Sequence, residues 1–516
     1  MPHRVRGADA DASVPAPAGH RTASFRPSMV RLTTSLREPA VEDPWLNWRS
    51  SMTRRAVVIG AGLAGMLAAA ALSGAADEVI VLDRDDLPDG PDHRKGLPQG
   101  RHAHLLMAGG LAAMENVVPG VSMRRHLLAA GAHDIPLGSG MVALTPEGWF
   151  RRWRHDGPHM LACSRALLDW TVRTAVLDHT QVELRQAQVL ELTGRDGRVT
   201  GVRLSTGGED TELHADFVVD ASGRGSRVAH WLERLGVTGI HERTVDSGLV
   251  NATRVYRVPE GAERFPLTVV QADPYANRPG RSGMVMPIEG GRWMVSLAGT
   301  RGGEPPADPE GFLRYILDLP HPIVGQLISG AEPLTDVHIS RSTHNARRYL
   351  EKAGDWPEGL VVLGDALATY NPAYGQGMSV AALGARFLGE EVRRSGLGAP
   401  GLARRVQRGA ARSVDAAWAM AVGQDVWYPQ TRGGRPNAAD RLVTRYSRRL
   451  TKAATGSYRA ASALWDVTSL TAGPERLLHP ATLLAVLNGA LLPPLEGPPL
   501  TAEERGVLRG LERASV

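Results

Sequence analysis

A glycine-rich turn between two apolar stretches constrains this chain more than any other feature. The apolar run 56–59 ends at the sequence GAGLAG, residues 60–65, which opens a stretch rich in Ala and Leu. A second apolar run, 79–82, follows and ends at Asp83. A strand, a tight turn, a helix and a second strand in this order predict a βαβ unit. The N-terminus of its helix offers unpaired N–H groups to a phosphate.

Each residue of this pattern has an expected task. Gly60 permits the tight turn, Gly62 lets a pyrophosphate approach the backbone, and Gly65 lets the helix pack closely on the strand. Asp83 ends the second strand, where a carboxylate accepts hydrogen bonds from ribose hydroxyls. We place its neighbour Arg84 with it among the residues predicted to bind a dinucleotide.

The same apolar segment has an alternative interpretation. Residues 56–76 carry no charge and follow Arg54 and Arg55, as in a membrane span or a twin-arginine signal. Glycines at fixed spacing and a second apolar run that ends at a carboxylate favour the βαβ unit. We therefore expect no membrane span.

Composition excludes several classes of protein. The chain has 516 residues, too many for one simple core, and a net charge of +5. Only three of its basic residues are lysines and no long basic tract occurs, so we expect no nucleic-acid partner. Cys163 is the single cysteine, which excludes an intramolecular disulfide and fits the cytoplasm. His, Asp and Glu show no metal-binding spacing, and we predict no metal.

Two further segments carry candidate ligand-binding residues. Arg94 and Gln99 lie in a loop after the βαβ unit, where Arg94 could pair with a pyrophosphate and Gln99 could bond a polyol chain. Arg165 opens a predicted helix at 164–177. Asp220 begins the sequence DASGRGS after the strand 216–219, and its small residues permit close backbone approach to a ligand. Each assignment has an alternative. The loop with Arg94 and Gln99 could be solvated, Arg165 could form a surface ion pair, and the segment after Asp220 could be an ordinary turn.

The most specific stretch is GDALATYNPAYGQGMS, residues 364–379, which follows the predicted buried strand 360–363. A carboxylate at the strand end can accept from ribityl hydroxyls, and a loop with little side-chain bulk lets a flat ring lie against it. The next helix directs its N–H groups at that ring. With the two earlier stretches this predicts one FAD, and the residues assigned to it here are Gly364, Asp365, Pro372, Gly375, Gln376, Gly377 and Met378.

These three motifs resemble the group A flavin monooxygenases, which have the fold of p-hydroxybenzoate hydroxylase. A narrower similarity to the bacterial polyether epoxidases, relatives of squalene epoxidase, rests on HRKGLPQ (93–99), PIEGGRW (287–293), NPAYG (371–375) and WDVTSL (465–470). The resemblance implies an α/β fold. It combines a Rossmann-type FAD-binding domain with an inserted antiparallel-sheet substrate domain and a helical C-terminal region.

The expected organisation follows from composition and from the strand pattern. Predicted strands at 182–192, 201–204, 250–258, 283–287 and 293–299 precede a largely helical region that begins near 376 and breaks at 428–437. A start at Met29 or Met52 is a hypothesis that the native mass would test. The predicted parts are a disordered arm (1–52), a discontinuous FAD-binding domain (53–110, 151–235, 355–395), a substrate domain (111–150, 236–354) and the helical region (396–516).

The resemblance also implies a reaction. Reduced flavin and oxygen would form a flavin hydroperoxide that epoxidises an alkene of an apolar polyketide or terpenoid-like intermediate, so we assign no catalytic residue. NADPH or NADH would reduce the flavin, directly or through a flavin reductase as partner. An aromatic polyketide hydroxylase and a cyclase with structural FAD remain alternatives. The substrate candidates are Met284, Met286, Trp293 and Tyr374.

Overall fold

The computed structural model describes residues 53–514 except 119 and 342–343. The predicted arm and both candidate start residues therefore lie outside the described residues.

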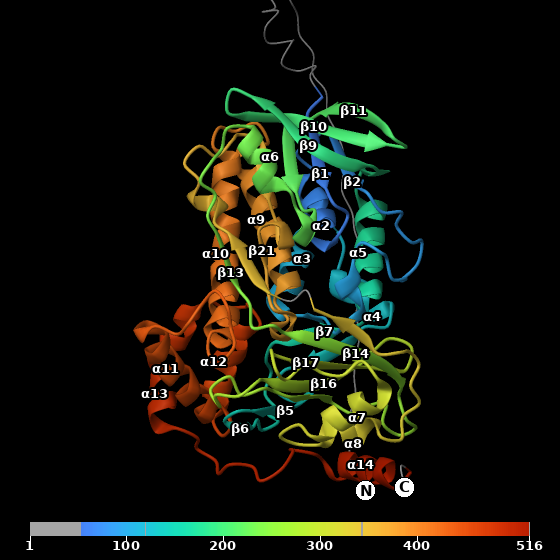
Figure 1. The fold of residues 1–516 in the computed structure, drawn as a ribbon, viewed down its shortest axis with the longest axis vertical. Helices are drawn as coiled ribbons and strands as arrows, with labels where there is room; N and C mark the ends of the chain where they lie inside the picture. The colour runs from blue at the N-terminus through green and yellow to red at the C-terminus, as the bar shows by residue number, and fades with distance from the viewer. Residues whose placement is uncertain (1–52, 119, 342–343, 515–516) are drawn as a thin grey trace, which may run out of the picture. The chain divides into compact units, whose positions relative to one another are not determined.

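The predicted βαβ unit lies at the centre of a parallel sheet (Figure 1). Helix α2 (Leu63–Leu72) connects two neighbouring strands and is buried along almost its whole length. The end of the first strand lies beside Asp220, because Ile59 pairs with it. The predicted Rossmann-type fold is confirmed. In order across the sheet, the five strands are β20 (Leu360–Val362), β12 (Phe217–Asp220), β1 (Arg55–Ile59), β2 (Glu78–Asp83) and β8 (Val182–Gln186).

Helices far apart in the sequence cover this sheet. Helix α2 packs against both α5 (Arg165–His179) and α9 (Gly377–Ser395), and α9 packs against α10 (Leu402–Asp425). Their apolar faces form one large core with the five strands. Three shorter helices belong to this part: α3 (Ala108–Glu115), α4 (Met123–Ala129) and α6 (Val228–Arg234).

The single strand predicted at 182–192 is wrong. Its first half, β8, runs parallel to β2 as far as the pair Asp83 and Gln186. Because β2 ends there, no parallel partner remains, and the chain changes partner after Ala187. It continues in a separate three-stranded antiparallel sheet, β9 (Gln188–Arg195), β10 (Arg198–Thr206) and β11 (Glu209–His214).

The predicted inserted sheet has seven strands. All its neighbouring pairs are antiparallel except β5 and β15, which are parallel. Its order across the sheet is β18 (His338–Ser340), β14 (Val250–Arg257), β17 (Arg292–Gly299), β16 (Arg281–Ile288), β15 (Leu267–Val270), β5 (Met141–Thr145) and β6 (Gly148–Trp149).

Small elements join the two large sheets. One set is β13 (Glu242–Val245), β19 (Asn345–Arg348) and β21 (Ala368–Thr369), and the other is β3 (Leu105–Leu106), β7 (His159–Ala162) and β4 (His133–Pro136). Helices α7 (Pro309–Leu317) and α8 (Ile323–Ile328) cover one face of the seven-stranded sheet.

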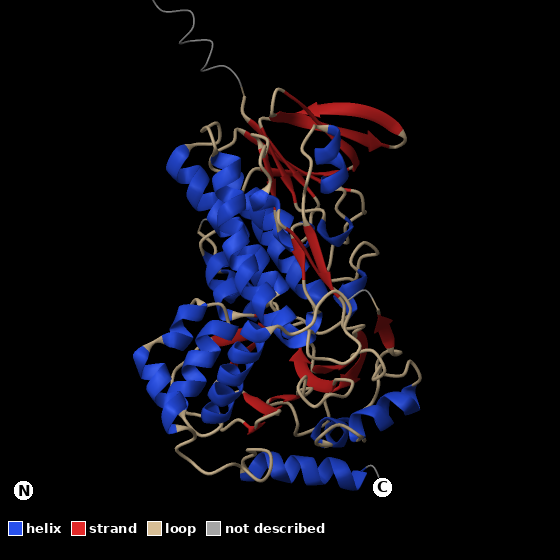
Figure 2. Cartoon of the chain, turned by 60° about the vertical axis from the view of Figure 1, so that its left-hand side comes forward, coloured by secondary structure: helices blue, strands red, loops and turns tan. Residues whose placement is uncertain are grey.

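The C-terminal part is helical, as predicted (Figure 2). Residues 428–437 form neither helix nor strand, which agrees with the predicted break. Within the described part of the chain, no helix has the length and apolarity needed to cross a bilayer. The four helices here are α11 (Ala438–Ala454), α12 (Tyr458–Thr468), α13 (Pro480–Asn488) and α14 (Ala502–Ala514).

Candidate flavin site

Backbone contact explains two of the three glycines in the first turn. Gly60 has φ +97°, and a methyl group there would lie 2.7 Å from the carbonyl oxygen of Ala221. A methyl group at Gly65 would lie 1.8 Å from the carbonyl oxygen of Gly60. Only glycine at position 65 therefore allows helix α2 to lie this close to the end of β1. The turn is therefore fixed by local sterics.

Asp83 faces this turn, while Arg84 points away from it. The Asp83 carboxylate accepts hydrogen bonds from the Ala61 N–H at 2.7 Å and from Arg94 at 3.1 Å. The Arg84 side chain is 70% exposed and lies 3.7 Å from Asp85. Of the two predicted ligands, the structure brings only Asp83 to the glycine turn.

Arg94 shows that the turn fits a diphosphate. A methyl group at Gly62 would lie 3.4 Å from an Arg94 terminal nitrogen, so the guanidinium stands directly over the turn. The Arg94 Nε is buried and has no hydrogen-bond partner. Helix α2 has neither a side-chain cap nor an acidic residue in its first turn. Free N–H groups beside a partly unpartnered guanidinium are the donors that a pyrophosphate would require at this turn.

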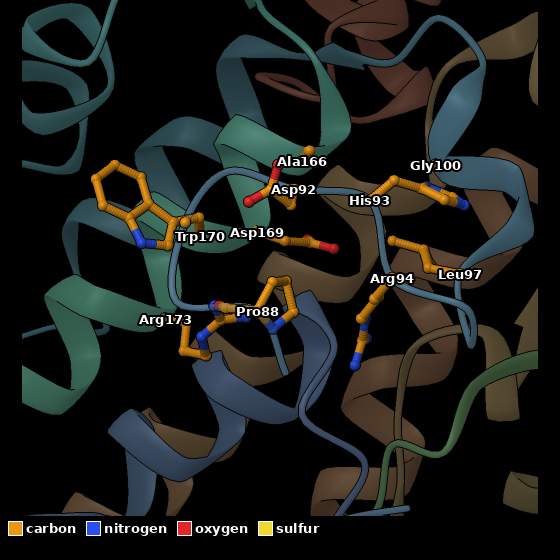
Figure 3. Close-up of a pocket in the computed structure, with 11 residues that line it drawn as sticks. Pro88, Asp92, His93, Arg94, Leu97, Gly100, Ala166, Asp169, Trp170 and Arg173 are labelled. Atoms are coloured by element: carbon orange, nitrogen blue, oxygen red, sulfur yellow. The ribbon is translucent and has the colours of Figure 1, made fainter. Parts of the chain in front are cut away.

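A small pocket lies beside Arg94, between the loop 88–100 and helix α5 (Figure 3). Asp169 and Trp170 reach it from the helix, and His93 and Leu97 reach it from the loop. Trp170 donates its indole N–H to the Asp89 carbonyl at 2.9 Å and so holds the loop on the helix. Gln99 belongs to the same loop and is half-buried.

Asp220 shapes its own loop. It is fully buried, and its carboxylate accepts hydrogen bonds from the Ser222 N–H at 3.0 Å and the Ser226 hydroxyl at 2.6 Å. Burial raises the pKa of Asp220, and the serine hydrogen bonds oppose that shift. Asp220 thus stabilises the backbone at Ala221 and Ser222, which lies against Gly60.

The ring end of the predicted site joins three distant segments. Gly364 has φ +62°, and a methyl group there would lie 2.7 Å from the Ala64 side chain in α2. Burial raises the pKa of Asp365, while the nearby Arg224 and Arg165 lower it. Arg165 also pairs with Asp169 at 2.8 Å. The structure therefore brings the predicted residues Arg165 and Asp365 into one electrostatic environment.

The loop that follows turns at a glycine and leads into an uncapped helix. Gly375 is left-handed, with φ +67°, and a methyl group there would lie 3.2 Å from the terminal carbon of Met107. Gln376 is buried; its amide nitrogen donates to the Thr468 carbonyl at 3.3 Å, and its Oε1 has no partner. Helix α9 begins at Gly377 without a side-chain cap, and its second residue, Met378, is buried.

A buried carboxylate that the sequence reasoning missed holds this loop. Asp425, the last residue of α10, accepts hydrogen bonds from Tyr374 at 2.7 Å, Asn345 at 2.7 Å and Asn371 at 3.1 Å. Ser247 also donates to it at 3.2 Å. We call these five residues the Asp425 hub. It ties the predicted ring loop to a helix end and two strand ends, and no local motif at Asp425 signals this role.

Two histidines of the segment 98–107 are also part of the site. His102 contacts the Thr253 hydroxyl at 2.9 Å, and Thr253 contacts the Ser296 hydroxyl at 2.8 Å. Burial lowers the pKa of His102 to about 4. Burial, with the nearby Arg165 as second cause, lowers the pKa of His104 to about 3. Both rings are therefore neutral at pH 7. The series of side-chain contacts from His102 through Thr253 to Ser296 connects the segment 98–107 to the inserted sheet.

The four substrate candidates fall into three environments. Met286 pairs with Met294 and Met284 pairs with Ser296 across β16 and β17, so these side chains share one sheet face. Trp293 lies on the opposite face, packed in the core with α7 and α8. Trp293, which was predicted as a substrate residue together with Met284 and Met286, is therefore separated from them by the sheet. The Tyr374 hydroxyl donates a hydrogen bond to Asp425 within the hub.

The sequence profile described as FAD binding domain matches residues 53–392. The chain belongs to this family. Predicted membership among proteins like the group A flavin monooxygenases is confirmed, as is FAD as the cofactor of the fold. The match ends inside α9, so it contains all the predicted cofactor-binding residues and omits Asp425.

Two curated proteins are similar to this chain over more than half of its length. The chain is 32% identical to Protein Rv3254 of Mycobacterium tuberculosis over 71% of its own length and 78% of that protein. It is 26% identical to kynurenine 3-monooxygenase of Salinispora tropica over 63% of its length and 70% of that enzyme. The family is one of FAD-dependent monooxygenases.

Solved structures show the fold without selecting a reaction. The flavin-dependent brominase Bmp2 is similar with a TM-score of 0.51 at 16% identity, over 89% of this chain and 98% of that one. The Diels-Alderase PyrE3 has a TM-score of 0.52 at 18% identity, over 80% of each chain. Different chemistries share the architecture, so the reaction must be argued from the side chains of this chain.

Proposed function

We propose that this protein is an FAD-dependent monooxygenase that epoxidises an alkene of an apolar polyketide or terpenoid-like molecule. The observation that carries the proposal is the sheet face beside the ring loop, which we call the methionine face. On β15, β16 and β17 its central positions are taken by apolar side chains and one serine, none of them ionisable: Leu267, Val269, Met284, Met286, Met294 and Ser296. Thr253 of β14 lies opposite Ser296 on the same face.

The surroundings of this face favour a flexible, water-poor substrate site. Met286 and Met294 are buried, while Met284 is half-buried. Leu105 and Met107 pack in the same cluster, and Met107 also reaches the ring loop at Gly375. Methionines adapt to irregular apolar shapes, which suits a long hydrocarbon chain. The face can therefore hold a double bond beside the loop and exclude water there.

The residues of the cofactor site supply binding and orientation. Arg94 and the turn 60–65 would hold the diphosphate, and Asp83 would accept from the ribose. Asp365, held between Arg224 and Arg165, would accept from the ribityl chain. A reduced FAD held by these residues would supply the two electrons with which one atom of O2 is transferred to the substrate while the other leaves as water. NADPH or NADH, directly or through a flavin reductase, would supply the electrons.

One observation favours a second candidate, hydroxylation of an aromatic polyketide. The Ser296 hydroxyl lies on the methionine face and contacts the Thr253 hydroxyl, which in turn contacts the buried His102 imidazole. Such a hydroxyl can bond a phenol and orient it. The similarity to kynurenine 3-monooxygenase agrees with this alternative.

Turnover with labelled oxygen tests both candidates. The FAD-loaded protein is supplied with NADPH or a flavin reductase, oxygen-18, and separate panels of apolar polyenes and polycyclic phenols. One labelled oxygen atom in a polyene, with no label in any phenol, is the expected result. Label in phenols alone selects the hydroxylase. Unlabelled cyclised product formed without reductant would overturn both and select a cyclase with structural FAD.

A further inference from the structure

The C-terminal helices expose a group of leucines that the predicted reaction does not use. Leu487 of α13 is 80% exposed and Leu491 is 70% exposed. They belong to a stretch, residues 480–495, without a single charged residue. Large exposed apolar groups on a folded protein mark an interaction site. We call this group the leucine surface; its members are Leu478, Leu483, Leu484, Leu487, Leu491 and Leu492.

The core does not require these leucines. Thr482 and Ala485 of α13 are buried, and Val486 packs beside Trp465 in the adjoining apolar cluster. These positions attach the helix to the rest of the protein. Leu483, Leu484 and Leu487 project from the other side, so their apolarity serves a contact outside the chain.

Helix α11 packs beside α13 (Figure 1). Its sequence is strongly basic. Arg441, Arg445, Arg449 and Lys452 are exposed on it, and Leu442 between them is 71% exposed. Its one acidic residue, Asp440, is occupied in the capping box with Asn437. Exposed cations therefore lie on the helix that packs beside α13, and α13 itself carries no acidic residue.

We propose that the leucine surface docks on an anionic lipid bilayer, with its leucines in the interface and the α11 cations at the phosphate level. An apolar helix face beside arginines is the combination that binds such interfaces. A symmetric contact with a second copy would bring this basic surface against itself, which like charges oppose. Helix α13 has nine residues, so it can lie on a bilayer but not cross it.

Vesicle flotation of the full, FAD-loaded protein tests the proposal. Expected is binding to vesicles of phosphatidylcholine and phosphatidylglycerol in equal parts, with weaker binding to phosphatidylcholine alone and release by salt. Leu484→Glu with Leu487→Glu should reduce partitioning at least about tenfold. Arg441→Glu with Arg445→Glu should reduce it about tenfold on the anionic vesicles only.

Matched controls separate docking from folding. Leu317→Glu with Leu334→Glu alters two exposed leucines elsewhere and should leave flotation unchanged. Flavin absorbance shows that each variant is folded, and Leu487→Glu alone serves where the double variant fails to fold. Wild-type protein that does not float, or leucine variants that float equally well, would overturn the proposal. So would a stable dimer that Leu487→Glu dissociates, because the surface would then be a subunit contact.

Discussion

The two ends of the flavin site are stabilised by different kinds of interaction. At the adenosine end, Gly60 and Gly65 fix the turn through contacts with backbone atoms, and a single methyl group would break them. At the ring end, the loop 371–375 is held by Asp425, which lies 51 residues beyond Tyr374 and 54 beyond Asn371. The first constraint is steric and largely local, whereas the second is polar and depends on the tertiary fold. Substitutions should therefore affect the two ends differently.

The largest expected effect is at the adenosine end. Gly65→Ala should lower the free energy of unfolding by about 3 kcal/mol or more and abolish FAD retention, because the methyl group would overlap the Gly60 carbonyl oxygen. Chemical denaturation and the flavin absorbance of the purified protein measure both. Gly74→Ala is the control, since a methyl group there meets open space. Equal stability of the two variants would contradict the steric account.

The Asp425 hub should give the next largest effect. Asp425→Asn places an amide nitrogen among donors from Tyr374, Asn371 and Asn345, which costs about 2 to 3 kcal/mol and loosens the ring loop. The expected readouts are weaker FAD binding by fluorescence titration and an altered visible spectrum. Tyr374→Phe removes one donor and should cost about 1 kcal/mol. An unchanged spectrum in Asp425→Asn would show that the hub does not position the ring.

Arg94 tests the electrostatic part of the adenosine end. Arg94→Gln removes the ion pair with Asp83 and the cation over the turn, so FAD should bind about tenfold more weakly. Arg84→Gln is the matched control because its side chain points into solvent. If both variants bound FAD equally, Arg94 would not contact the diphosphate.

The last expected effect depends on pH and concerns the buried His102 and the half-buried His104. Their pKa values are lowered from 6.5, to about 4 for His102 and about 3 for His104, so below pH 6.5 the unfolded chain binds more protons than the folded one. Stability should fall by about 1 to 2 kcal/mol per histidine between pH 7 and pH 5. Melting temperatures of the wild type and of His102→Asn with His104→Asn measure it. Parallel pH curves would contradict neutral buried imidazoles.

Local patterns were enough to predict the cofactor fold. Gly60, Gly65 and Asp83 were predicted because their turn depends on neighbours in sequence and on one strand–helix–strand unit. The antiparallel sheet was predicted from strand alternation. Met284, Met286 and Trp293 were all named as substrate candidates, but the strand pattern could not say that Trp293 faces the other way. That requires the register between β16 and β17 and the position of α7 and α8.

The sequence by itself determined the glycine turn at 60–65, the strand that leads to it and the loop near residue 372, because glycine permits backbone conformations closed to other residues and proline fixes its own φ angle. The tertiary structure alone decided which carboxylate holds that loop, which methionines face it and which leucines remain outside. Those outcomes depend on pairs of residues that are distant in the chain, and a buried polar group or an apolar face acquires its role only from what packs against it.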